Sequence, residues 1–127
     1  MRWNHWVASG SCLAGLAVLA GAFGQHALEA RLAPERLRIF EVAVRYHMVH
    51  SLAIVMTGLL SRNGPRGLGK AGWAFLAGIV LFSGSLYVLC LMDWKALGIV
   101  TPFGGLAFVA GWAVIAWKFI WISKFGA

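Results

Sequence analysis

The sequence predicts an all-α integral membrane protein, a single domain built as a bundle of four transmembrane helices. Of its 127 residues, 61% are hydrophobic and 12% are charged, and the mean hydropathy is +0.79. A soluble domain of this size leaves much of its surface in water, so it cannot hide this much apolar surface. Four stretches also approach the roughly 20 apolar residues that a span requires. The expected spans cover residues 6–26, 34–61, 70–92 and 102–123.

Small residues in these spans predict where the helices touch. Helices in lipid associate by close van der Waals packing, which small side chains permit. The first span carries them at alternating spacings of four and three, and shorter sets occur later: Gly10, Ala14, Ala17, Gly21 and Gly24, then Gly84, Gly104 and Gly111. The longest stripe predicts that the first helix lies near the centre of the bundle.

The second helix is expected to begin before its membrane span. Pro34 suits the first turn of a helix, and apolar residues recur at Leu37, Phe40 and Val44. This spacing predicts an amphipathic extension at the membrane surface, from which Arg45 snorkels outward. The fourth helix is expected to start at Thr101 as N-cap, followed by Pro102.

The net charge of +7 is explained by lipid head groups rather than nucleic acid, because the basic residues flank the spans. Four spans place both termini and the Arg62–Lys70 loop on one side, with Lys and Arg at positions 2, 62, 66, 70, 118 and 124. The opposite side has five basic residues together with all four acids. The positive-inside rule therefore favours cytoplasmic termini. An aromatic belt is expected beside the termini, from Trp3, Trp6, Trp73, Trp117 and Trp121.

Polar residues from all four spans are expected at similar depth near the side opposite the termini. Ionisable residues inside spans are rare and often functional. The candidate cluster consists of His26, Tyr46, His50, Ser83, Ser85, Asp93 and Thr101, with His47 as a secondary member.

Two interpretations of this cluster stay open. In the first, His26, Tyr46 and His50 form a buried brace between the first two helices. In the second, the cluster binds haem, a metal, a quinone or a transferred proton. His26 with either His50 or His47 would supply the facing haem ligands, and a zinc or copper site would use His26, His47, His50 and Asp93. No catalytic motif of soluble enzymes occurs, so no cofactor is required and no enzyme activity is expected. A non-catalytic accessory or scaffold subunit, packed against partner subunits or further copies of itself, is the leading hypothesis; a small transport or cofactor-binding module is the alternative.

Four motifs carry a family resemblance: "GAFGQHALEARL", "FEVAVRYHMVHSLAIV", "FSGSLYVL" and "LGIVTPFGGLAFVAGW". In this order they resemble the domain-of-unknown-function 423 family, which includes small bacterial membrane proteins and the transmembrane protein 256 group of eukaryotes. The resemblance runs from about Gly10 to Trp112 and implies a four-helix protein of the bacterial inner membrane or of mitochondria. It favours His26 and His50 over His5 and His47 as the pair to test.

Overall fold

The computed structural model describes the backbone of residues 2–125 and the side chains of residues 2–24 and 26–121. These residues form helices joined by short turns, and no strand occurs among them. The elements, in order, are α1 (Trp3–Leu19), η1 (Ala20–Gly24), α2 (Gln25–Leu28), α3 (Pro34–Asn63), α4 (Gly69–Gly78), η2 (Ile79–Gly84), α5 (Ser85–Met92), η3 (Lys95–Ile99) and α6 (Thr101–Phe125). The side chain of Lys124, assigned above to the side of the termini, lies outside the described residues.

Four helical rods are long and apolar enough to cross a membrane, which confirms the predicted fold class. The first rod joins α1, η1 and α2, and the third joins α4, η2 and α5, because η1 and η2 are π-helical segments inside continuous helices. The second rod, α3, has 30 residues and is therefore about 45 Å long, more than the about 30 Å hydrocarbon core. Its first turns extend beyond the span, as expected from Pro34.

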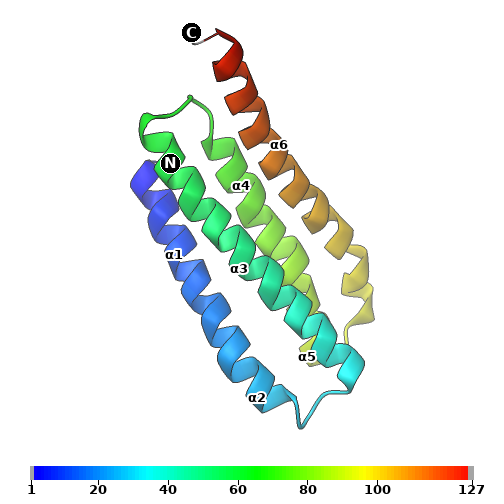
Figure 1. Ribbon diagram of the computed structural model, residues 1–127. Coiled ribbons are helices and arrows are strands. Elements are labelled where there is room, and N and C mark those ends of the chain that lie inside the picture. The colour runs from blue at the N-terminus through cyan, green and yellow to red at the C-terminus, as the bar shows by residue number, and fades with distance from the viewer. Residues whose placement is uncertain (1, 126–127) are drawn as a thin grey trace.

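The helices lie in the order α1, α3, α4–α5 and α6, as Figure 1 shows. The prediction that the first helix is central is wrong. In the most apolar 18-residue window of each rod, 39% of the residues are buried in α3 but only 11% in the first rod. The small stripe of α1 packs against α3, whereas α3 also contacts the third rod and α6. The central position therefore belongs to α3.

The core lies in the half of the protein nearer the termini. Its buried residues come from α1, α3, the third rod and α6, and they include Trp6, Ile54, Phe75, Ile79 and Phe108. Trp6 is 1% exposed and stacks edge-on against Trp73, with 5.3 Å between ring centroids. Trp6 is thus a core residue and not a belt residue as expected, whereas Trp3, Trp73, Trp117 and Trp121 are exposed at this end.

Glycines set the closest helix contacts. A Cβ added to Gly10 would lie 2.7 Å from the backbone N of Val55, so α1 and α3 approach backbone to backbone. A Cβ on Gly111 would lie 2.5 Å from the ring of Phe75, and one on Gly104 would overlap Phe82. Gly10 of α1 and the glycines Gly104 and Gly111 of α6 therefore pack against other helices of the same chain.

The ends of α5 and α6 are held by side-chain contacts. Arg36, near the start of α3, forms an ion pair with Asp93, which follows α5 in a left-handed conformation with φ 55°. Thr101 is the first residue of α6 and not its N-cap, because its hydroxyl donates backward to the Leu97 carbonyl at 3.3 Å. The N–H of Phe103 instead donates to the carbonyl of Val100.

Candidate functional site

His50 lies in the interior between α3, α4 and α6. Its ring stacks on Phe108 with 3.5 Å between centroids and an angle of 11° between planes. Phe75 lies on another side of the ring, 5.7 Å away. The imidazole is therefore surrounded by aromatic rings from the third and fourth rods and is buried.

Both ring nitrogens of His50 are hydrogen-bonded. Trp112 Nε1 lies 3.2 Å from His50 Nε2, and because an indole N–H can only donate, Nε2 is the acceptor. The proton of the neutral ring is then on Nδ1, which lies 2.8 Å from the Tyr46 carbonyl oxygen and donates to it. His50 thus links α3 to α6, and neither nitrogen retains a lone pair for a ligand.

Tyr46 lies at the edge of this aromatic cluster. Its side chain is 41% exposed, and its ring packs on Phe82 at 4.6 Å and faces Phe108 at 6.0 Å. Tyr46 and His50 are one turn apart on α3. These two members of the predicted cluster therefore lie next to each other.

His47 faces a different helix. Its Nδ1 lies 3.1 Å from the hydroxyl of Tyr87 on α5, and its backbone carbonyl accepts a hydrogen bond from Ser51 at 2.7 Å. His47 Nε2 and Ser83 Oγ are buried without a hydrogen-bond partner. Both atoms belong to the interface between α3 and the third rod, where unpaired polar atoms are rare.

Ser85 and Thr101 form a third polar contact. Their hydroxyl oxygens lie 2.8 Å apart. The single proton of the Ser85 hydroxyl can be donated either to Thr101 or to the Phe82 carbonyl, which lies 2.9 Å away. This contact joins the start of α5 to the start of α6.

The structure does not bring His26 or Asp93 to His50. His26 is exposed on α2, beside the end of α3 where Gly24 contacts Phe40. Phe40 precedes His50 by ten residues, which is about 15 Å along a helix, so His26 and His50 cannot hold one haem between them as hypothesised. Asp93 pairs with Arg36 instead. Among the described residues, no three His, Cys, Asp or Glu side chains lie together as a metal site would require.

The brace therefore differs from the expected one, since His50 ties α3 to α6 and not the first helix to the second. Trp112 and Phe108, which complete it, were missed in the sequence analysis. The available signal was their spacing of four on one apolar helix, together with an indole N–H that needs an acceptor inside the membrane.

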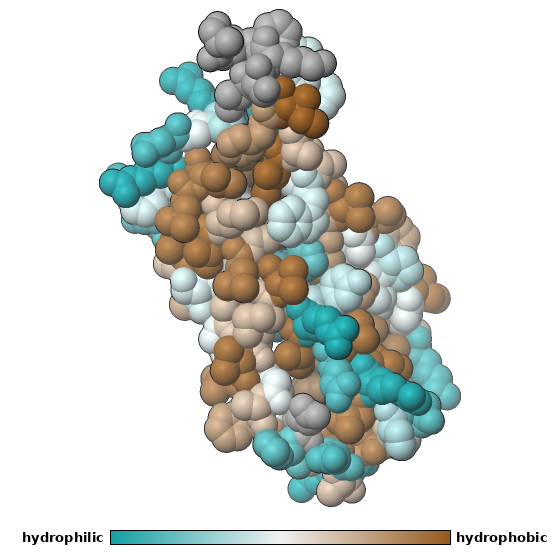
Figure 2. Space-filling model, in the orientation of Figure 1, coloured by the Kyte–Doolittle hydropathy of each residue, from teal (hydrophilic) through white to brown (hydrophobic). Residues whose placement is uncertain are grey.

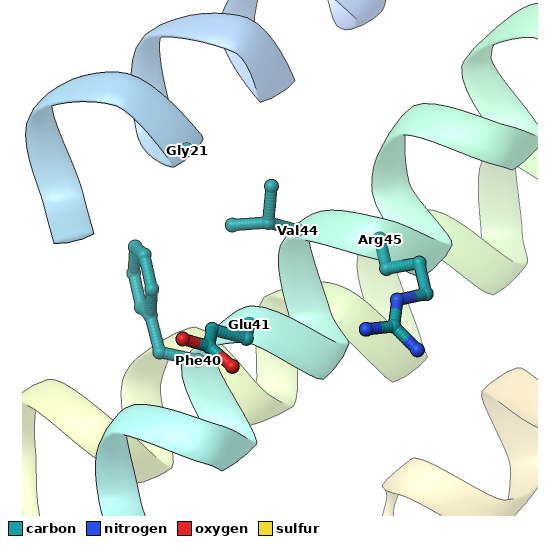
Figure 3. A pocket seen from close by; sticks show the side chains of 5 residues that line it. All are labelled: Gly21, Phe40, Glu41, Val44 and Arg45. Carbon is teal, nitrogen blue, oxygen red and sulfur yellow. The ribbon is translucent and has the colours of Figure 1, made fainter.

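Two surface hollows adjoin the polar residues. A groove of about 680 Å³ lies between α3 and α6, and its lining includes Tyr46, His50, Phe108 and Trp112. A second hollow, of about 280 Å³, lies where η1 crosses α3, and Figure 3 shows Phe40 and Val44 extending from α3 toward Gly21 there.

Comparisons with known proteins agree with this membrane architecture. A family model described as "Protein of unknown function (DUF423)" matches residues 20–105. A UPF0382 membrane protein of Staphylococcus haemolyticus is 42% identical over 100 residues, covering 79% of this chain and 82% of that protein. UPF0382 membrane protein YwdK of Bacillus subtilis is 43% identical over 108 residues, covering 84% of this chain and 88% of YwdK. No solved structure matches the chain. With four membrane-spanning rods and these relatives, the chain belongs to the DUF423 family of small membrane proteins.

Proposed function

We propose that this protein is a non-catalytic accessory or scaffold subunit that packs laterally against the transmembrane helices of other membrane proteins. The observation that supports the proposal is a second row of small residues on α1, on the face turned away from α3. Its exposed members are Ala8, Ser11, Cys12 and Gly15.

This row is suited to a helix contact. Ala8 and Gly15 are seven residues apart within α1, so they lie on one side of the helix. A Cβ added to Gly15 would meet nothing within 4 Å, whereas the space beside Gly10, on the other side of α1, is occupied by Val55. Within lipid, such a face allows another helix to approach closely.

The interior of the bundle supports a structural role for its polar groups. His50 uses both ring nitrogens to join Tyr46 and Trp112, and Ser85 bonds Thr101. These contacts connect helices to one another. The surfaces left for other molecules are therefore the lateral ones.

The test is native-gel migration with mass spectrometry, after gentle detergent extraction of the protein from its source membrane at its natural level. We expect migration within an assembly that contains other membrane proteins. Gly15→Leu should release the chain from this assembly, whereas Leu16→Phe, an enlargement on a neighbouring exposed face of α1, should not. Migration of the wild type alone, or as an oligomer of this chain only, would overturn the accessory role.

A second candidate is a small binding or transport module. The observation that favours it is the pair of buried, unpartnered atoms His47 Nε2 and Ser83 Oγ, because such atoms are satisfied by a water, a proton or a small polar ligand. Proton flux into liposomes containing the purified protein tests this candidate. Flux that His47→Gln and Ser83→Ala abolish in a folded protein supports it, and equal flux in protein-free liposomes rejects it.

The cofactor version of this candidate has a spectroscopic test. A Soret band in the visible spectrum of the purified protein would support bound haem. A spectrum with aromatic absorption only would reject haem.

A further inference from the structure

The groove between α3 and α6 is longer than one hollow. A neighbouring hollow of about 320 Å³ is lined by Arg45, Tyr46, Val49 and His50, and it shares the last three residues with the groove. Another hollow of about 320 Å³, whose lining includes Arg38 and Thr101, shares Phe82 with the groove. The three hollows are neighbours on the membrane-facing surface, and we call them together the α3–α6 groove.

The walls of the α3–α6 groove are apolar over most of their length. From α6 the lining runs from Pro102 to Trp112, ten residues or about 15 Å. This length equals the depth of one leaflet, half of the about 30 Å hydrocarbon core. Leu106 is 65% exposed and Val109 is 64% exposed, so the groove is open to the surrounding bilayer.

Both charged residues that line the groove are arginines. Arg38 lines the hollow that also contains Thr101, and Arg45 lines the one with Tyr46. They are seven residues apart on α3 and therefore lie on one side of the helix. Arg38 has only a 3.7 Å contact with Glu35, and both side chains are more than 70% exposed, so this pair is weak.

The arginines lie at the depth of the lipid head groups. The helices α3 and α6 run in the same direction and are aligned by the stacking of His50 on Phe108. Arg45, five residues before His50, is therefore level with the first turn of α6. Figure 2 shows hydrophilic side chains over this half of α3, with apolar surface beside them.

We propose that the α3–α6 groove binds an anionic phospholipid of the leaflet opposite the termini. Arg38 and Arg45 contact the phosphate and the anionic head group, because guanidinium groups bind phosphate through charge-assisted hydrogen bonds. An acyl chain lies along Tyr46, Val49, Leu106 and Val109 toward Trp112. This site does not include the exposed face of α1, so the lipid-binding proposal and the accessory role can be tested separately.

The acidic residues near the site do not line this groove. Glu41 lies between the two arginines in sequence and lines the hollow with Gly21 and Phe40, on the side of α3 that faces α1. Arg45 lines that hollow as well as the groove. Glu35 belongs to the first turn of α3, before the first arginine. The head group therefore meets positive charge along the groove itself.

The experiment uses electron spin resonance of the purified protein in phosphatidylcholine bilayers. The probes are phosphatidylglycerol and phosphatidylcholine, each with a spin label on the acyl chain, and the measurement is the motionally restricted fraction of each probe. We expect a preference for phosphatidylglycerol in the wild type. Arg45→Gln should lower its association by about fivefold, the factor that one basic residue contributes near an anionic surface.

Two matched variants test the position of the site. Arg31→Gln removes an exposed positive charge from the same side of the membrane, outside the groove, and should retain the preference. Leu106→Trp fills the groove and should reduce the restricted phosphatidylglycerol, whereas Leu16→Trp, on exposed α1 surface, should not. Circular dichroism establishes that each variant is folded.

Three results would overturn the proposal. The first is equal restriction of the two probes by the wild type. The second is an equal loss with Arg31→Gln and Arg45→Gln, which would mean general surface charge. The third is full retention of the preference in folded Leu106→Trp.

Discussion

The indole Nε1 of Trp112 donates a hydrogen bond to Nε2 of His50 over 3.2 Å, and this bond joins α6 to α3 inside the membrane. The two residues are 62 positions apart in the sequence. The bond also determines which nitrogen of His50 carries the proton, and thereby directs Nδ1 to the Tyr46 carbonyl. One contact thus positions a side chain and closes the bundle.

Trp112→Phe tests the strength of this contact. Phenylalanine retains an aromatic ring against Phe75, which lies 5.0 Å from the Trp112 ring, but leaves His50 Nε2 without a donor. We expect the free energy of unfolding to fall by about 1 kcal/mol, typical of a hydrogen bond between membrane helices. The measurement is unfolding by sodium dodecyl sulfate in mixed micelles, followed by circular dichroism. Trp117→Phe, at an exposed position of the same helix, is the control, and an equal loss in both variants would contradict the prediction.

His26→Ala and His50→Ala should differ in their effect on stability. His50→Ala removes two hydrogen bonds and the stacking on Phe108, so the free energy of unfolding should fall by about 2 kcal/mol. His26 is exposed on α2, so His26→Ala should change stability by less than about 0.5 kcal/mol. The same micelle titration measures both. Comparable losses would mean that His26 belongs to the brace after all.

Gly10→Ala and Gly15→Ala probe opposite faces of α1. The new methyl group of Gly10→Ala would lie 2.8 Å from the Ser51 carbonyl oxygen and 2.7 Å from the Val55 nitrogen. Both are backbone atoms, so α1 must move away from α3, and we expect a loss of about 1–3 kcal/mol. At Gly15 the space is open, so alanine should not lower stability. Thermal unfolding of the purified monomer in detergent distinguishes the two, and a loss at Gly15 alone would reverse the assignment of the faces.

Asp93 combines an ion pair with a left-handed backbone, and two substitutions separate these features. Asp93→Asn removes the ion pair with Arg36. The Arg36 side chain is 34% exposed and that of Asp93 is 53% exposed, so the free energy of unfolding should fall by less than about 1 kcal/mol. Asparagine accepts the φ of 55°, whereas a β-branched residue does not. Asp93→Val should therefore lower the free energy of unfolding by about a further 1–2 kcal/mol. Unfolding at low and high salt checks this: the ion-pair part should shrink with salt, and the backbone part should not.

Some features of the molecule follow from local sequence alone. Long apolar stretches with short polar connections require membrane helices, because an unpaired backbone polar group in lipid is very unfavourable. Pro34 predicted the start of α3 for the same local reason. The spacing of Gly10, Ala17 and Gly24 indicated a close contact face, and α3 occupies it.

Other features needed the three-dimensional arrangement. The stripe of small residues predicted a contact but not the number of neighbours, so α1 was placed at the centre that α3 occupies. Depth in the membrane predicted that His26 and His50 would meet. The structure places them at different depths, because His26 lies beside the start of α3, about 15 Å along the helix from His50.

The sequence by itself determined the fold class and the residues able to pack closely, because hydrophobic length and small-residue spacing act along one helix. The tertiary structure decided which helix is central, which polar side chains meet, and which small residues remain on the surface. These outcomes depend on the rotation of each helix against its neighbours. Bulky residues from distant segments set that rotation by filling the space that the glycines leave, as Phe108 does beside Gly78 and Phe75 beside Gly111.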